Sequence, residues 1–91
     1  MTYIPPTDDM KFALRYLAGF DAVAALPAFT DTGLDLADAV IDEAAKLAAD
    51  VIAPLNHASD LKGAAYSDTE SSVQTPDGFA DAYRAMAEGG W

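Results

Sequence analysis

Apolar side chains recur at helical spacing along most of this chain. The first such stretch covers residues 8–30 and carries two apolar stripes. One stripe comprises Met10, Leu14, Leu17 and Ala18, and the other comprises Phe12, Tyr16 and Phe20. A helix that is apolar on two sides is usually wedged between neighbours. Gly19 marks the end of the first helix and Asp21 can cap a second, shorter one, whereas two adjacent prolines make residues 1–7 an extended arm.

The strongest helical pattern covers residues 35–56. Its apolar face comprises Leu36, Val40, Ala44, Leu47, Ala48, Val51 and Leu55, and its polar face comprises Asp38, Asp42, Lys46 and Asp50. Asp35 can cap the start of this helix. Pro54 either stops the helix or kinks it. Because the apolar spacing continues to Leu55, the pattern favours a kink followed by one further turn.

A third helix is predicted over residues 75–89. Thr75 can cap its start, and Pro76 can take the first helical position. Its apolar face comprises Phe79, Tyr83, Met86 and Ala87. Gly89 or Gly90 can supply a left-handed cap at its end.

These patterns predict an all-α fold in which three to four helices, joined by irregular loops, make one small domain over residues 1–91. The chain is long enough for one such domain. Its 52% hydrophobic share is largely alanine. Alanine favours helix but buries little area. Bulky core residues are therefore scarce, and we expect these helices to belong to a larger object.

Charge and composition exclude several classes of function. The net charge of −10 repels phosphate backbones and anionic lipid, so nucleic-acid and membrane-surface partners are disfavoured. The chain has no cysteine, so it has no disulfide framework and no thiolate metal site. No apolar run approaches the roughly 18 residues of a membrane span. The first residues, "MTYIPPTDDMK", lack the features of a secretory signal, and we expect a cytoplasmic protein.

No residue shows a pattern that supports a catalytic, cofactor-binding or metal-binding role. His57 is the only histidine, and no nucleophile or pocket accompanies it. We interpret it as a residue at the surface or at a helix end, where cations are favoured. Carboxylate pairs such as Asp38 and Asp42 are typical of the solvent-exposed face of an amphipathic helix.

Residues 57–74 are irregular in pattern, with a short extended segment expected around residues 65–74. Within it, Asp68, Glu70 and Ser72 alternate in a way that echoes a calcium-binding loop. Such a loop needs glycine at its sixth position and glutamate at its twelfth, and this sequence has valine and phenylalanine there. We therefore predict a solvated turn.

The aromatic residues near the end of the chain raise the question of a ligand pocket. Phe79 and Tyr83 lie at helical spacing, which is more typical of core packing than of a ligand site. Trp91 follows two glycines. A large aromatic side chain just past a helix cap often packs back onto neighbouring structure.

Three segments carry a family resemblance. Residues 3–23, "YIPPTDDMKFALRYLAGFDAV", combine a Tyr-x-x-Pro arm with an Asp-Met-x-Phe helix. Residues 37–60, "ADAVIDEAAKLAADVIAPLNHASD", place "APLN" near the end of a long helix. Residues 73–91, "VQTPDGFADAYRAMAEGGW", are the most specific. In this order they resemble the N-terminal helical domain of flavin-dependent acyl-CoA dehydrogenases, in the C-terminally extended branch that includes the 3-methylmercaptopropionyl-CoA dehydrogenases.

The resemblance implies an enzyme that binds FAD and removes hydrogens from Cα and Cβ of an acyl-CoA thioester. In that family a glutamate takes the α proton and the flavin accepts the β hydride. Both the glutamate and the main flavin contacts lie beyond the matched region, so the resemblance assigns no catalytic or FAD-binding residue here. It implies a fragment that is inactive alone, whose partners are the remainder of the subunit, the acyl-CoA substrate and further copies in a homo-oligomer.

A different class of function fits the length, charge and helix content equally well. A small acidic carrier or interaction module, such as an acyl carrier protein, has these properties. Such a carrier has a serine at a helix start, where phosphopantetheine is attached. The nearest match is "TGLDL" at Thr32–Leu36, with Gly33 in place of the serine.

Overall fold

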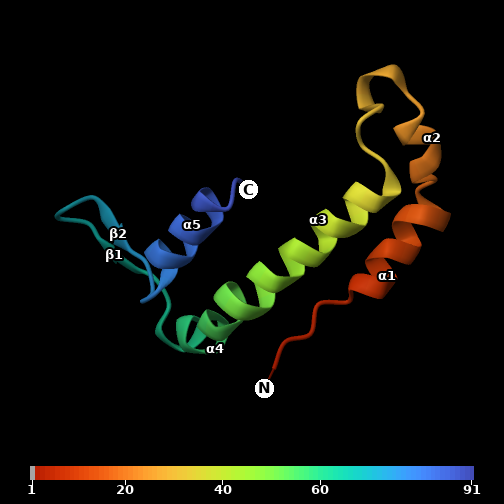
Figure 1. The fold of residues 1–91 in the computed structure, drawn as a ribbon. Helices are drawn as coiled ribbons and strands as arrows, with labels where there is room; N and C mark the ends of the chain where they lie inside the picture. The colour runs from red at the N-terminus through yellow and green to blue at the C-terminus, as the bar shows by residue number, and fades with distance from the viewer. Residues whose placement is uncertain (1) are drawn as a thin grey trace. The chain divides into compact units, whose positions relative to one another are not determined.

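The computed structural model describes residues 2–91, and the predicted all-α class is confirmed. Helices account for 64% of the chain, and the strands of the described part form one small two-stranded sheet (Figure 1). The sequence suggested one small domain, but the described residues divide into two compact units. One unit is Ile4–Lys46, and the other combines residues 2–3 with Leu47–Trp91.

The first unit begins at Ile4, and its first helix starts at Thr7. Its elements are α1 (Thr7–Phe12), the π-helical turn η1 (Ala13–Leu17), α2 (Phe20–Ala24), the 3-10 turn η2 (Pro27–Phe29) and α3 (Leu34–Leu47). Gly19 is left-handed, with φ 63° and ψ 47°, and it separates η1 from α2. Glycine adopts this conformation without the steric cost that other residues incur. Gly19 is also the N-cap of α2, so Asp21 lies in the first turn instead of capping it.

The second unit contains the elements that follow α3. They are the π-helical turn η3 (Ala48–Ile52), α4 (Ala53–Lys62), β1 (Ala65–Ser67), β2 (Ser72–Gln74) and α5 (Phe79–Glu88). Helical structure thus continues to Lys62, six residues beyond the predicted end at residue 56. Pro54 lies in the first turn of α4. There its missing N–H costs little, because the preceding π-helical turn already departs from α-helical hydrogen bonding.

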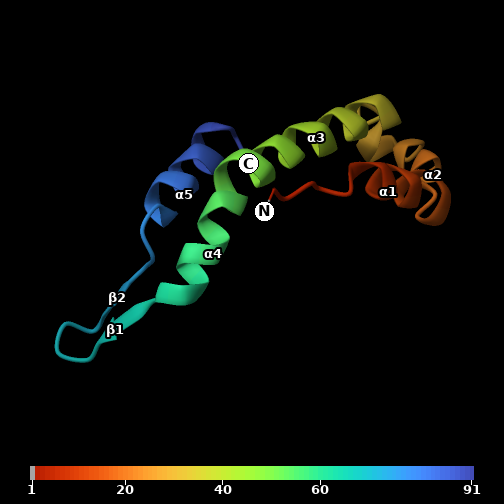
Figure 2. The same ribbon diagram turned by 90° about the horizontal axis from the view of Figure 1, so that it is seen from below.

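The expected extended segment is a β-hairpin that joins the end of α4 to α5 (Figure 2). β1 and β2 are antiparallel, and Tyr66 pairs with Val73. The loop between them is fixed locally, since the Ser67 hydroxyl accepts a hydrogen bond from the Glu70 backbone N–H at 3.3 Å. A side chain that bonds its own backbone in this way stabilises a turn.

The last helix, α5, begins at Phe79, four residues later than predicted, and Thr75 does not cap it. Its N-cap is Gly78, with φ 89°. A Cβ at Gly78 would lie 2.6 Å from Cδ2 of Leu55, so the chain turns into α5 where only glycine leaves room for α4. The adjacent Pro76 is the single residue of the described part that is fully buried.

A Schellman motif ends α5. The Trp91 N–H donates to the Met86 carbonyl at 3.2 Å, and the Gly90 N–H donates to the Ala87 carbonyl at 3.1 Å. Gly90 has φ 80°, as this motif requires. The indole of Trp91 folds back over the end of the helix. A Cβ atom placed on Gly89 would lie only 3.0 Å from its Cδ1 atom, which shows how closely the ring approaches.

We expect Gly78→Ala to destabilise the second unit more than Gly90→Ala does. Both substitutions place a Cβ on a residue with positive φ, which costs about 1–2 kcal/mol. Only Gly78→Ala also drives that Cβ into Leu55, since nothing lies within 4 Å of the Gly90 position. The overlap adds roughly 1–3 kcal/mol. The loss of helical circular dichroism on heating measures both effects, and equal losses in the two variants would contradict the close approach.

Candidate interaction surface

Within residues 2–91, no three His, Cys, Asp or Glu side chains come close enough together to hold a metal ion. No helix of this part of the chain is long and apolar enough to cross a membrane. His57 is exposed and lies in the middle of α4, because the helix continues to Lys62, so of the two predicted placements it has the surface one and not the helix-end one.

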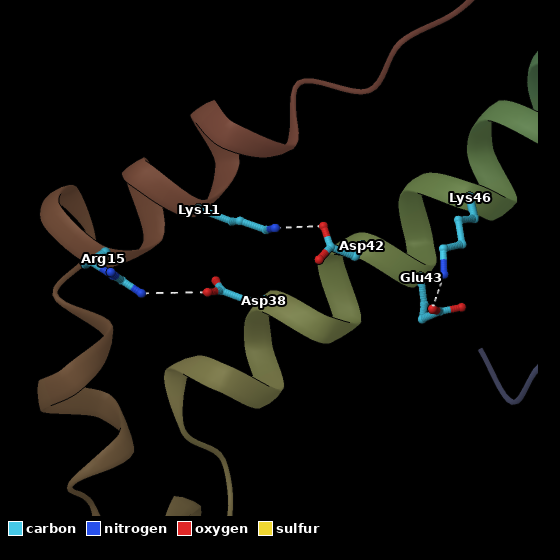
Figure 3. Close-up of polar contacts among 6 residues, drawn as sticks. All are labelled: Lys11, Arg15, Asp38, Asp42, Glu43 and Lys46. Carbon is cyan, nitrogen blue, oxygen red and sulfur yellow. Dashed lines mark hydrogen bonds and ion pairs between the residues drawn. The ribbon is translucent and has the colours of Figure 1, made fainter.

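Two ion pairs fix α1 and η1 against α3 in the first unit (Figure 3). Lys11 Nζ donates to Asp42 Oδ1 at 2.7 Å, and the Arg15 guanidinium lies 3.6 Å from Asp38 Oδ2. The hydrogen bond to Asp42 raises the pKa of the Lys11 ammonium, and the negative charge of Asp38 acts in the same direction. Both pairs are partly exposed, so they set the orientation of the helices more than they add stability.

These ion pairs reverse part of the expected packing of α3. Asp38 and Asp42 were predicted to lie on its solvated face, yet this is the side to which α1 attaches. Leu36 and Val40, predicted to face a core, remain 50% and 46% exposed. The two cations of α1 and η1 pair with the acidic side of α3, so only the first part of the apolar stripe is exposed. Its later members are half-buried, namely Ala44, Leu47, Ala48, Val51 and Leu55.

The second unit shows the same inversion in α5. The side chains that are half-buried there are Ala82 and Ala85. The bulky residues of the predicted apolar face remain partly exposed, with Phe79 at 41%, Tyr83 at 74% and Met86 at 37%. The helix therefore leaves this side incompletely covered within its unit, most of all at Tyr83.

Exposure of apolar side chains extends through both units. No hydrophobic side chain of residues 2–91 is fully buried. Several bulky ones are more than half exposed, including Ile4, Phe12, Tyr16, Leu17, Leu61, Tyr66 and Val73. Single apolar side chains on a surface are common, but contiguous apolar faces mark interaction sites. The candidate functional surface of this chain is thus a set of helix faces.

Comparison with known proteins shows which enzymes this chain resembles. No family model matches the chain. The chain is 33% identical over 91 residues to a 3-methylmercaptopropionyl-CoA dehydrogenase of Ruegeria pomeroyi, and the match covers all of this chain. Two butyryl-CoA dehydrogenases of Syntrophomonas wolfei are 33% and 31% identical, each over 97% of this chain. The chain therefore resembles the N-terminal part of acyl-CoA dehydrogenases.

The lengths of these acyl-CoA dehydrogenases are as informative as the identities. The chain spans only 15% of the length of each relative. Such a match is what an N-terminal fragment would give, because the resemblance in residues 3–23, 37–60 and 73–91 follows the order of the family's first helices. Most of the polypeptide found in the relatives therefore has no counterpart among these 91 residues.

We expect the raised pKa of Lys11 to depend on Asp42. A lysine whose pKa is raised in the folded state contributes stability that is present below its ordinary pKa of 10.5 and is lost as the pH rises through the raised value. In Asp42→Asn, NMR titration of the Lys11 side chain should show a pKa that moves back toward 10.5. Asp35→Asn removes an acid from the same helix and serves as the control. An unchanged Lys11 pKa in Asp42→Asn would show that the hydrogen bond is not formed in solution.

We also expect the isolated chain to bind a hydrophobic dye through the exposed side of α5. Tyr83→Ser and Phe79→Ser should each lower dye fluorescence, because they remove apolar surface from that side without disturbing the half-buried alanines. Asp81→Ser, a change to a charged residue of the same helix, should leave the fluorescence unchanged. Equal fluorescence in all three variants would place the dye elsewhere.

Proposed function

We propose that this chain is the N-terminal segment of an FAD-dependent acyl-CoA dehydrogenase and acts as a structural part of the subunit. The observation that carries the proposal is the match along the whole chain to relatives more than six times longer. The uncovered apolar helix faces support it, because a segment taken from a larger fold retains the faces that the rest of that fold would bury.

The reaction of the whole enzyme would be α,β-dehydrogenation of an acyl-CoA thioester, for which bound FAD supplies the hydride acceptor. The groups of this chain do not suit FAD binding. Phosphates are held by free cations or by helix N-termini. All five Lys and Arg side chains already form ion pairs with carboxylates, and the net charge of −10 opposes a pyrophosphate. We infer that the flavin contacts and the catalytic base come from the remaining polypeptide.

The role left for this segment is to pack on the rest of the subunit and to form one side of the acyl pocket. The acyl-CoA substrate and a homo-oligomeric state enter the proposal through the same resemblance, and a cytoplasmic location is kept in it as predicted from the sequence. The carrier alternative lacks its attachment residue, since Gly33 stands at the start of α3 and only its carbonyl is engaged, accepting the Ala37 N–H at 3.0 Å.

A chimaeric enzyme tests this proposal. The matched first segment of the Ruegeria pomeroyi dehydrogenase is replaced by these 91 residues, so that one continuous chain results. We expect a soluble yellow protein that holds FAD stoichiometrically and is bleached by an acyl-CoA substrate. The same enzyme without any first segment, and this chain alone mixed with FAD, should both stay colourless.

Two results would count against the proposed function. A chimaera that folds but binds no FAD would show that this segment cannot replace its counterpart. A gain of mass by the isolated chain after coexpression with a phosphopantetheinyl transferase would support the carrier alternative instead.

A further inference from the structure

The helix α5 has three chemically distinct sides. Phe79, Tyr83 and Met86 follow one another at i, i+4 and i+7 and therefore share one side, which we call the aromatic side of α5. The charged residues Asp81, Arg84 and Glu88 lie on the opposite side by the same spacing. Ala82 and Ala85 lie between the two, and these alanines are the half-buried ones.

The unit that contains α5 covers this aromatic side only in part, since Phe79 remains 41% and Met86 37% exposed. Packing within the unit involves the alanine side of α5 and the close approach of Gly78 to Leu55. Tyr83, at the centre of the aromatic side, is 74% exposed. Asp81 and Arg84 pair with each other at 2.9 Å on the solvated side, so that side already has its charges matched.

Charge narrows the choice of what covers the aromatic side. A second copy would bring two chains of net charge −10 together, and the described part has ten carboxylates outside the five ion pairs. Like charges brought to an interface oppose association. An anionic lipid surface is disfavoured for the same reason. A small ligand binds in a concave site, whereas one side of a helix is convex. These arguments leave a polypeptide surface that is apolar at its centre and less acidic at its rim.

The relatives indicate where such a surface is found, since about 85% of their length has no counterpart here. We propose that the aromatic side of α5 is the contact through which this segment docks onto the remaining polypeptide of its own subunit. The partner surface is apolar where it meets Tyr83 and carries an excess of Lys or Arg around that centre. This inference rests on the proposed function, and it adds the side of the helix that makes the contact and the chemistry of the surface that receives it.

The absence of cysteine from the chain makes a direct test available. Tyr83→Cys and Glu88→Cys place single thiols on the aromatic and the charged side of the same helix. Each variant is made in the free chain and in the chimaeric enzyme, and the rate of alkylation at that position is followed by peptide mass spectrometry. We expect the thiol at position 83 to react at least about tenfold more slowly in the chimaera than in the free chain. The thiol at position 88 should react at similar rates in both.

The outcomes separate this inference from the proposed function. A chimaera that holds FAD but alkylates equally fast at position 83 in both settings overturns the docking side and leaves the proposed function intact. A chimaera that never holds FAD overturns both. If Tyr83→Cys prevents FAD binding while Glu88→Cys does not, and the free Tyr83→Cys chain keeps its helical circular dichroism, the docking side is supported. In that case the Met86→Cys variant, whose thiol lies on the same side of α5, is used to measure protection from alkylation in the chimaera.

Discussion

The structure of this chain depends on one constraint, which is that its helices bury no bulky hydrophobic side chain completely. Alanines provide the half-buried positions of α5, and ion pairs join α1 and η1 to α3. Larger side chains such as Ile41, Val51 and Leu55 are covered only in part. Such contacts bring helices close together but remove a limited area of apolar surface from water. A chain with this arrangement holds its helices by local bonding and gains most of its hydrophobic stabilisation only when another surface covers it.

The similarity to longer enzymes and the exposed apolar helix faces both indicate that this chain is suited to a larger polypeptide. Relatives that are far longer show that homologous segments occur within a large polypeptide. The exposed apolar sides show that the helices are suited to such a setting.

The sequence predicted the helices well and predicted their contacts poorly, for physical reasons. Periodicity reports which residues lie on one side of a helix, and that information is local. It could not reveal that Lys11 and Arg15 would draw α1 to the acidic side of α3, because this depends on two segments more than twenty residues apart. The late start of α5 has a similar cause, since Thr75 and Pro76 form a good local start signal and Gly78 prevails through its approach to Leu55. No functional residue was predicted, and the surface that the structure reveals is one that the pattern had assigned to a core.

The π-helical turn η1 has a consequence for changes in chain length. A π turn holds one more residue than an α-helical turn, so this helix already contains the equivalent of a one-residue insertion between α1 and α2. Deleting one residue there would remove the extra residue of the turn and restore α-helical bonding. Because the π turn already absorbs that residue, the side chains of the helix on either side of it would keep nearly the same directions. Homologous segments that differ by one residue at this turn would thus present the same surface from a regular helix.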